Sequence, residues 1–374
     1  MRKIAFILAA PVGAFVLTLI ISSIALLLFG SNPIEAFGDM LGHASRLETQ
    51  VDILNRATPF YLSAVAAAIG FRMNLFNIGV EGQYLIAFLI AAQVGSLVSL
   101  PAILHIPLIM VVAMLVGAAY SGIAGVLLVT RGVNEVISTI MLNSIAVIGL
   151  IAWLQQAWQA EQGDTFTSTT LGTNPIDETG LVPNINGLLQ IFTRDLRLGK
   201  ELTGMLLVAI AVGVIYHLLL TRMRFGFDLR ASGLNPFAAS AGGVPPKRMI
   251  VWAMVLSGAV AGLIGMVELT EEAKFPPDPI QGLGFAGIAV ALLGRNHPLG
   301  MVFSALLFAF LDVSAGILQN TQAATKEIVN IMQGIILLAA VIAYGVTKRA
   351  QESEEARATA EALRATEPAE KVSS

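Results

Sequence analysis

The sequence predicts an all-α membrane protein, a bundle of about ten transmembrane helices with both termini on the cytoplasmic side. Charged residues make up only 13% of the 374 residues, about half of the roughly 25% that is usual in soluble domains. Apolar residues also fall in runs long enough to span a bilayer, because about 20 helical residues match a hydrocarbon core of about 30 Å. Composition and arrangement therefore both indicate a polytopic helix bundle.

Ten apolar segments account for this prediction, and two of them are short. The first follows Arg2 and Lys3, as in a secretory signal, but its uncharged run exceeds the roughly 7–15 residues of a signal core, so we interpret it as a retained helix. Segments 57–71 and 283–294 are expected to lie inside the bundle or to be partly re-entrant, where irregular backbone faces protein or water. The ten segments are 4–29, 57–71, 76–100, 103–130, 135–158, 202–221, 249–269, 283–294, 298–318 and 328–346.

Orientation follows from the Lys and Arg residues, which accumulate on the cytoplasmic side of membrane proteins. With the amino terminus inside, the cytoplasmic segments hold 15 of the 22 Lys and Arg residues. The transmembrane domain is then 1–347, with a polar external loop at 159–201 and a charged cytoplasmic tail at 348–374. The tail interleaves acidic and basic residues at helix spacing, which is typical of a solvated helix.

The most informative polar segment is 225–246, which lies between two spans on the predicted cytoplasmic side. Asn235 followed by Pro236 is a helix-start signal, because Asn supplies a side-chain acceptor and Pro has no N–H to lose. Gly242 or Gly243 can adopt the left-handed conformation that ends a helix. We therefore predict a short helix over 236–241. Its basic flanks favour a docking surface over the alternative, an ordinary structured loop.

No motif for enzyme chemistry is present. The chain lacks G-x-x-x-x-G-K-[ST], so it has no phosphate-binding loop of its own. Residues 282–287 match G-x-G-x-x-G, but a dinucleotide site needs a preceding strand and a βαβ unit, so close helix packing is the better interpretation, as at Gly258 and Gly262. Cysteine is absent, and no histidine forms an H-x-x-x-H pair, so we expect no metal site.

Glu81 is the strongest candidate among the polar residues in apolar surroundings, where ionisable groups are costly and usually functional. It lies in a polar, glycine-rich interruption at 74–83, and broken helices of this kind often form transporter sites. We expect Glu81 to line or gate a solute pathway. The structural alternative is a salt bridge to Arg72.

Three further polar residues lie within or next to apolar runs. Glu135 follows Asn134, a candidate N-cap, and either lines the pathway or simply occupies the first turn of its helix, where the dipole favours it. Asp312 is expected to pair inside the bundle. Asn143 is neutral and is able to hydrogen-bond across helices.

Three motifs resemble those of a known family. They are Asn77-Ile-Gly-Val-Glu-Gly-Gln83, Gly132-Val-Asn-Glu-Val-Ile137 with Met141-Leu-Asn143, and Gly284-Phe-Ala-Gly-Ile-Ala-Val-Ala-Leu-Leu-Gly294. Together they resemble the permease subunits of bacterial ABC importers of the branched-chain amino acid and ribose type, and within that type the nucleoside or simple-sugar permeases. The resemblance covers residues 57–346, which is most of the chain.

This resemblance implies a transport subunit, not an enzyme, in the bacterial cytoplasmic (inner) membrane. The expected partners are two ABC ATP-binding subunits, a second homologous permease and an external solute-binding lipoprotein; no nucleic acid is expected. No cofactor is expected on this chain, because ATP and Mg²⁺ would bind to the ATP-binding subunits. The permease would translocate a nucleoside or a related neutral, sugar-containing solute.

The resemblance also implies two sets of site residues. The substrate pathway would be lined by Asn77, Glu81, Gln83, Glu135, Asn143 and Phe285. Coupling to the ATPase would involve Arg230, Asn235, Ala238, Ala239 and Gly243. The docking signature of such permeases is only partly matched, because Phe237 occupies the position of its Glu. The alternative function is an ion-coupled secondary transporter that uses Glu81 or Asp312 as a proton site, and a third is a membrane scaffold.

Overall fold

The computed structural model describes residues 32–158, 172–189 and 200–320, with single positions between 20 and 30 and between 331 and 338. Most of segments 4–29 and 328–346, most of the loop at 159–201 and the whole tail at 348–374 lie outside the described residues. Residues 41–314 form one compact unit, and the described residues on either side belong to a second. The described part is helical, apart from an isolated antiparallel bridge between Asn184 and Thr203.

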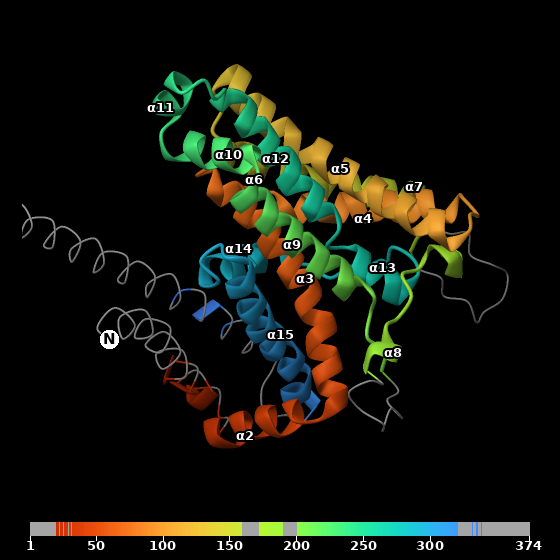
Figure 1. Cartoon of the computed structure of the whole chain (residues 1–374). Helices are drawn as coiled ribbons and strands as arrows, with labels where there is room; N and C mark the ends of the chain where they lie inside the picture. Colours follow the sequence, from red (N-terminus) through yellow and green to blue (C-terminus); the bar gives the residue numbers. More distant parts are fainter. Residues whose placement is uncertain are drawn as a thin grey trace, which may run out of the picture. The chain divides into compact units, whose positions relative to one another are not determined.

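The first half of the larger unit contains the longest helices (Figure 1). Helix α3 is not the short segment predicted at 57–71: it spans 26 residues, about 39 Å at 1.5 Å per residue. Residues 47–56 extend it beyond its apolar part. The helices of this half are α3 (Leu47–Arg72), α4 (Val80–Ser96), α5 (Ala102–Arg131), α6 (Glu135–Ser144), the π-helix η1 (Ile145–Leu150) and α7 (Ile151–Ala157). Helix α2 (Pro33–Ala44) precedes them and belongs mostly to the other unit.

The second half begins after the external-loop segment and is more interrupted. The predicted span 249–269 is two helices, because the backbone breaks after Gly262, and α14 is as short as predicted, with 11 residues. The elements are the 3₁₀ helix η2 (Glu178–Gly180), α8 (Asn186–Leu189), α9 (Met205–Arg222), α10 (Arg224–Leu234), α11 (Pro236–Ala241), α12 (Pro246–Gly262), α13 (Met266–Glu272), α14 (Leu283–Leu293) and α15 (Pro298–Asn320).

Within the described ranges, four helical stretches are long and apolar enough to cross a bilayer: 102–131, 135–157, 205–222 and 246–272. Two shorter apolar helices, 283–293 and 298–314, accompany them. The all-α membrane architecture is therefore confirmed. The count of about ten spans and the cytoplasmic position of both termini remain predictions.

Small residues bring α5 and α12 into direct backbone contact. A side chain at Gly258 would collide with the carbonyl oxygen of Gly117, and one at Gly262 with the carbonyl oxygen of Ala113. Close approach through small residues is how membrane helices gain van der Waals contact without a hydrophobic driving force. The prediction that Gly258 and Gly262 serve packing is confirmed. Next to this pair lies α4, whose residues from Val80 to Leu89 are all buried.

Candidate functional site

The turn between α3 and α4, residues 73–79, is built by side chains that take the place of helix hydrogen bonds. Asn74 adopts a left-handed backbone with φ of 59°, which Asn tolerates better than most residues. The Oδ1 atom of Asn77 accepts a hydrogen bond from the Gly79 amide at 3.2 Å, a local turn that starts α4. The polar interruption predicted from the sequence is thus a defined backbone structure.

Asn77 and Gln83 are the centre of a buried polar network. The two amide groups exchange hydrogen bonds of 2.8 and 2.9 Å, and Asn77 Nδ2 also lies 2.9 Å from Ser257 Oγ. Ser257 in turn donates to the carbonyl of Ala66 at 2.7 Å. The network joins α3, α4 and α12, and a satisfied buried network of this kind fixes one arrangement of its helices. The side chains of Asn77 and Gln83 are buried, at 1% and 2% exposure.

Glu81 caps the amino-terminal end of α14. Its two carboxylate oxygens accept hydrogen bonds from the backbone amides of Gly282 at 2.5 Å and Gly284 at 2.7 Å. The first amide groups of a helix lack intrahelical partners, and a carboxylate there is also favoured by the helix dipole. The Tyr84 hydroxyl lies 3.1 Å from Glu81 and 2.5 Å from the carbonyl of Ile280. The first and third motifs therefore meet at this point.

The alternative salt bridge between Glu81 and Arg72 is not formed. Arg72 instead donates to the carbonyl of Asn296 at 2.7 Å, and that carbonyl also accepts from the Tyr216 hydroxyl at 3.0 Å. Arg72 thus ties the end of α3 to the turn between α14 and α15.

Residues of the middle motif hold α6 to α4. Asn134 caps α6 as predicted, since its side chain accepts from the amides of Val136 and Ile137. Glu135 is half-buried in the first turn of that helix. Asn143 Oδ1 accepts from the Gly82 amide at 2.6 Å, which confirms the expected bond across helices. Phe285, in contrast, is 51% exposed on α14.

A cavity of about 280 Å³ lies between α3, α13 and α15 at the end of α3 opposite to Arg72. We call it the charged cavity. Asp312 pairs there with Arg56, so the predicted pairing of Asp312 inside the bundle is confirmed. Glu268 is only 7% exposed, and its two oxygens lie 3.1 and 3.2 Å from the amide of Ile280. The cavity is lined by Asp52, Asn55, Arg56, Pro59, Ile264, Val267, Glu268, Glu271, Ile280, Leu283, Asp312 and Val313.

None of the six predicted pathway residues lines the charged cavity. Sequence reasoning missed Arg56, Glu268 and Glu271 there. A signal was available for Glu268, because it is an ionisable residue inside the apolar run 249–269. A second, larger cavity of about 610 Å³ between α3, α9 and α15 is lined almost entirely by apolar side chains, so it offers few groups to recognise a polar solute.

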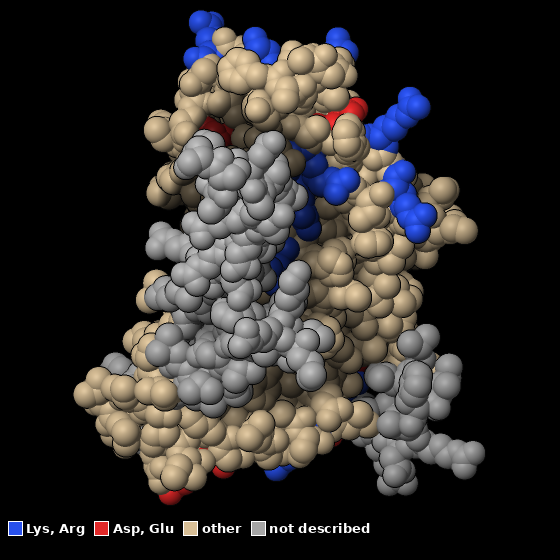
Figure 2. Space-filling model, turned by 60° about the vertical axis from the view of Figure 1, so that its left-hand side comes forward, with Lys and Arg blue, Asp and Glu red and all other residues tan. Residues whose placement is uncertain are grey.

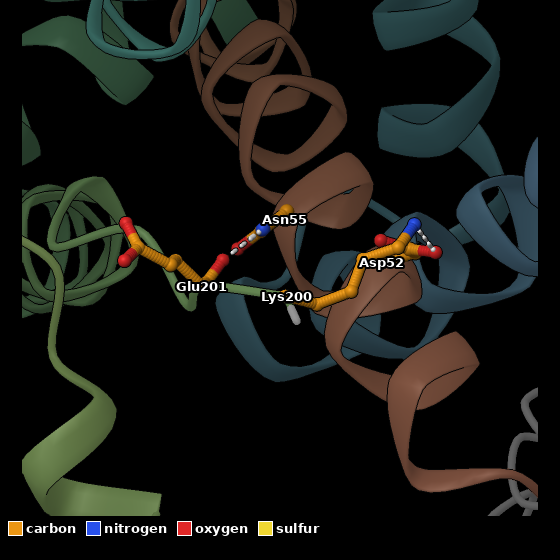
Figure 3. Close-up of polar contacts among 4 residues, drawn as sticks. All are labelled: Asp52, Asn55, Lys200 and Glu201. Atoms are coloured by element: carbon orange, nitrogen blue, oxygen red, sulfur yellow. Dashed lines mark hydrogen bonds and ion pairs between the residues drawn. The ribbon is translucent and has the colours of Figure 1, made fainter. Parts of the chain in front are cut away.

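The rim of the charged cavity is fixed by contacts between α3 and the segment before α9 (Figure 3). Asn55 donates to the carbonyl of Glu201 at 2.8 Å and accepts from the amide of Thr203 at 3.0 Å. One turn earlier, Asp52 pairs with Lys200 at 2.5 Å. These bonds, with the Arg56–Asp312 pair, give partners to the polar side chains of 52–56 and hold this end of α3 in place.

The predicted coupling segment lies at the other end of α3. Asn235 caps α11 as predicted, since its Oδ1 accepts from the amides of Phe237 and Ala238 at 3.0 and 3.1 Å. Gly243 takes the left-handed conformation, with φ of 83°. In α10, Gly233 packs against the backbone of Arg72 and Met73 so closely that a side chain there would collide with it. The segment is therefore in contact with the turn that leads to Glu81.

The coupling segment exposes an apolar pair between basic residues. Leu234 and Phe237 are each 88% exposed. Figure 2 shows Lys and Arg side chains gathered at the top of the view, where α10 and α11 lie in Figure 1. The basic residues of this region are Arg222, Arg224, Arg230, Lys247 and Arg248.

Of the predicted coupling residues, Ala239 faces inward and Arg230 bonds to its own helix. Ala239 is buried, at 5% exposure, so its methyl group belongs to the packing of α11 and is not on the exposed face. Arg230 Nε donates to the carbonyl of Gly226, one turn earlier in α10. Ala238, Asn235 and Gly243 are exposed. The most prominent exposed side chain of the segment is Phe237, the residue at the Glu position of the docking signature.

Comparison with known proteins gives relatives over most of the chain. The chain is 32% identical to the nucleoside ABC transporter permease protein NupB of Lactococcus lactis, over 87% of this chain and 88% of the relative. It is 31% identical to the guanosine ABC transporter permease protein NupP of Bacillus subtilis, over 91% and 94%. It is 29% identical to the glucose ABC transporter permease protein TsgB13 of Haloferax volcanii, over 88% and 85%.

A family model describes the same region. No solved structure matches the chain, whereas the model for the branched-chain amino acid transport system / permease component matches residues 50–341. The matched region contains all three motifs, the charged cavity and the coupling segment. The chain therefore belongs to the family of branched-chain amino acid transport system permease components.

Proposed function

We propose that the chain is the membrane-spanning permease subunit of an ATP-driven importer for nucleosides. The observation that carries the proposal is that relatives at 31–32% identity, covering most of both chains, are named nucleoside and guanosine ABC transporter permeases. The absence of a phosphate-binding loop from the sequence fits this role, because ATP hydrolysis then belongs to separate subunits.

The proposed complex holds two ATP-binding subunits, a second permease and an external solute-binding protein, in the cytoplasmic membrane. The coupling segment supports the ATPase contact, because exposed Leu234 and Phe237 offer an apolar anchor inside a basic rim, and aromatic and Arg side chains are enriched at protein interfaces. In the proposed complex, α10 and α11 lie on the cytoplasmic side. The charged cavity, at the other end of α3, then faces the external side.

The alternative, a secondary transporter that uses Glu81 or Asp312 as a proton site, is less well supported. Glu81 is engaged by the amides of Gly282 and Gly284, and Asp312 by Arg56. A proton carrier must release such partners in every cycle.

Uptake by the complete complex in membrane vesicles tests the proposal. Labelled guanosine should enter only with ATP, and unlabelled nucleosides should compete better than glucose or branched-chain amino acids. Uptake by the purified permease alone, driven by a proton or sodium gradient, would contradict the proposal. If glucose competed and nucleosides did not, the chain would still be an importer permease, but the proposed solute would be wrong.

The coupling surface is tested separately by charge substitution. Phe237→Asp should abolish co-purification of the ATP-binding subunits while the thermal stability of the permease stays unchanged, because the side chain is 88% exposed. Phe237→Tyr is the matched control and should retain the ATPase. Ala239→Asp should instead lower stability, because a charge would enter a buried position. Retention of the ATPase by Phe237→Asp would rule out this docking surface.

A further inference from the structure

We propose that the charged cavity is a binding site for the ribosyl part of a nucleoside, occupied before the solute passes the first and third motifs. The proposal rests on the function proposed above. It assigns a role to Arg56, Glu268 and Asp312, which the sequence motifs do not include. The argument starts from what the polar groups of the cavity have left to offer.

Glu268 has unused acceptor capacity. Both of its oxygens lie near a single donor, the amide of Ile280, whereas a carboxylate has about four acceptor positions. The side chain is held in one place by that bond and is 93% buried, the complement of its 7% exposure. A fixed, buried acceptor of this kind suits a hydroxyl donor that approaches from the cavity.

The Arg56–Asp312 pair offers the complementary chemistry. Arg56 uses its Nε atom on one oxygen of Asp312, so its two terminal amino groups remain as donors and the second Asp312 oxygen as an acceptor. The two side chains are 25% and 24% exposed, so a solute can reach them. A hydroxyl group both donates and accepts, and a ribosyl unit therefore suits a site with both kinds of partner.

The charge balance of the cavity excludes anions. Its lining residues include four carboxylates, Asp52, Glu268, Glu271 and Asp312, and one guanidinium, Arg56. Lys200 pairs with Asp52 at the rim, so the acidic groups still outnumber the basic ones by two. In such surroundings a phosphate would meet net repulsion, and like-charge juxtaposition is a strong means of rejecting a wrong ligand. The site should accept a nucleoside and reject the corresponding nucleotide.

Apart from Asn55, the remaining lining residues are apolar. Pro59, Ile264, Val267 and Val313 give a surface for the face of a base. The volume of about 280 Å³ is near the lower end of the range of about 300–1,000 Å³ that ligand pockets occupy. A small solute there would meet polar groups from α3, α13 and α15.

The cavity is also linked to the motif residues through a short segment of backbone. Ile280 and Leu283 line it; Glu268 holds the amide of Ile280, and Glu81 holds those of Gly282 and Gly284. A solute bound to Glu268 would thus touch the segment that Glu81 fixes. This placement gives Glu81 a positioning role in transport without direct contact to the solute.

Protection from chemical labelling tests the site directly, because the chain contains no cysteine. Val313→Cys places one thiol in the cavity wall, and Glu272→Cys places one on an exposed neighbour that does not line it. In the complete complex in nanodiscs, guanosine should slow maleimide labelling at position 313 several-fold and leave position 272 unchanged. Guanosine 5′-monophosphate should protect neither.

Two results would overturn the assignment: labelling at 313 that guanosine does not slow, or no labelling at 313, in a complex that still transports guanosine. A wild-type complex that takes up no nucleoside would instead refute the proposed function, and this is checked before any variant is made. The same reagent applied to intact cells tests whether the cavity opens outward.

Uptake kinetics provide the second test. Glu268→Gln keeps an oxygen that accepts from the Ile280 amide but removes the charged carboxylate oxygen proposed to bind a ribosyl hydroxyl. The KM for guanosine should therefore rise about tenfold or more. Preference for guanosine over its 2′- and 3′-deoxy analogues should fall as well, which a purely structural role would not cause. Glu272→Gln is the matched control and should stay within about twofold of wild type. Equal KM values and equal discrimination in the two variants would refute the proposal.

Discussion

The cap that Glu81 places on α14 predicts a loss of stability when the carboxylate is removed. Glu81→Ala would leave the buried amide of Gly284 and the less buried amide of Gly282 without their acceptor. A buried donor without a partner costs about 1–3 kcal/mol, so the loss at Gly284 should cost about that much, and Gly282, whose amide water can reach, should add less. Glu81→Gln keeps one of the two acceptor oxygens, so the expected loss in the free energy of unfolding is about half as large.

The control is Glu135, an acidic residue in the first turn of a helix that a neighbouring residue already caps. Glu135 occupies the first turn of α6, where Asn134 already caps the helix, so Glu135→Ala should cost only the dipole contribution of about 0.3–1 kcal/mol. Thermal unfolding of the purified chain in detergent, followed by its three tryptophans and by size-exclusion chromatography, ranks the variants. The expected order of destabilisation is Glu81→Ala, then Glu81→Gln, then Glu135→Ala.

Equal melting of Glu81→Ala and Glu135→Ala would refute the reasoning. It would mean that the amides of Gly282 and Gly284 find other partners. A pathway role without capping makes a different prediction: Glu81→Gln would then impair uptake while the melting temperature stays at the wild-type value. Uptake and melting temperature, both measured on Glu81→Gln, therefore distinguish a capping role of Glu81 from direct contact between Glu81 and the solute.

Three further predictions concern packing and local structure. Gly117→Ala should reduce the yield of folded protein, because its methyl group would collide with the carbonyl of Gly258. Gly149→Ala is the control and should be neutral, because nothing lies within 4 Å of the added methyl group. Expression level and monodispersity measure both effects. Asn77→Ala should lower the free energy of unfolding by roughly 2–4 kcal/mol, because the Gln83 amide would lose both of its bonds to Asn77 and Ser257 would lose one. A wild-type melting temperature would contradict this. Asn235→Ala should weaken α11 by about 1 kcal/mol, seen as faster hydrogen exchange of its amides while the bundle is unaffected.

The long apolar helices were predictable because a bilayer needs uncharged runs of fixed length. The predicted span 103–130 differs from α5 by one residue at each end. The start of α3 was not predictable in this way, because residues 47–56 include Glu48, Asp52 and Arg56. The charges of Asp52 and Arg56 are paired with Lys200 and Asp312, which lie far away in the sequence.

The candidate site was predictable in part. The caps Asn134 and Asn235 depend on local sequence, and the structure has both. The importance of Glu81 was visible from its apolar surroundings, but its partners were not, because they are backbone amides of residues 282 and 284. The charged cavity depends on three helices meeting, so single residues such as Glu268 could be noticed while the site itself could not.

The bonds from Glu81 to backbone amides also bear on how this region can change in evolution. No side chain at 282 or 284 takes part, and a side chain at 284 would collide with Glu81 itself. A search for co-varying residue pairs would therefore find no complementary partner for Glu81, only the retention of a small residue at 284. Exchange of either motif with a distant relative should fail unless the acid and the glycine are transferred together.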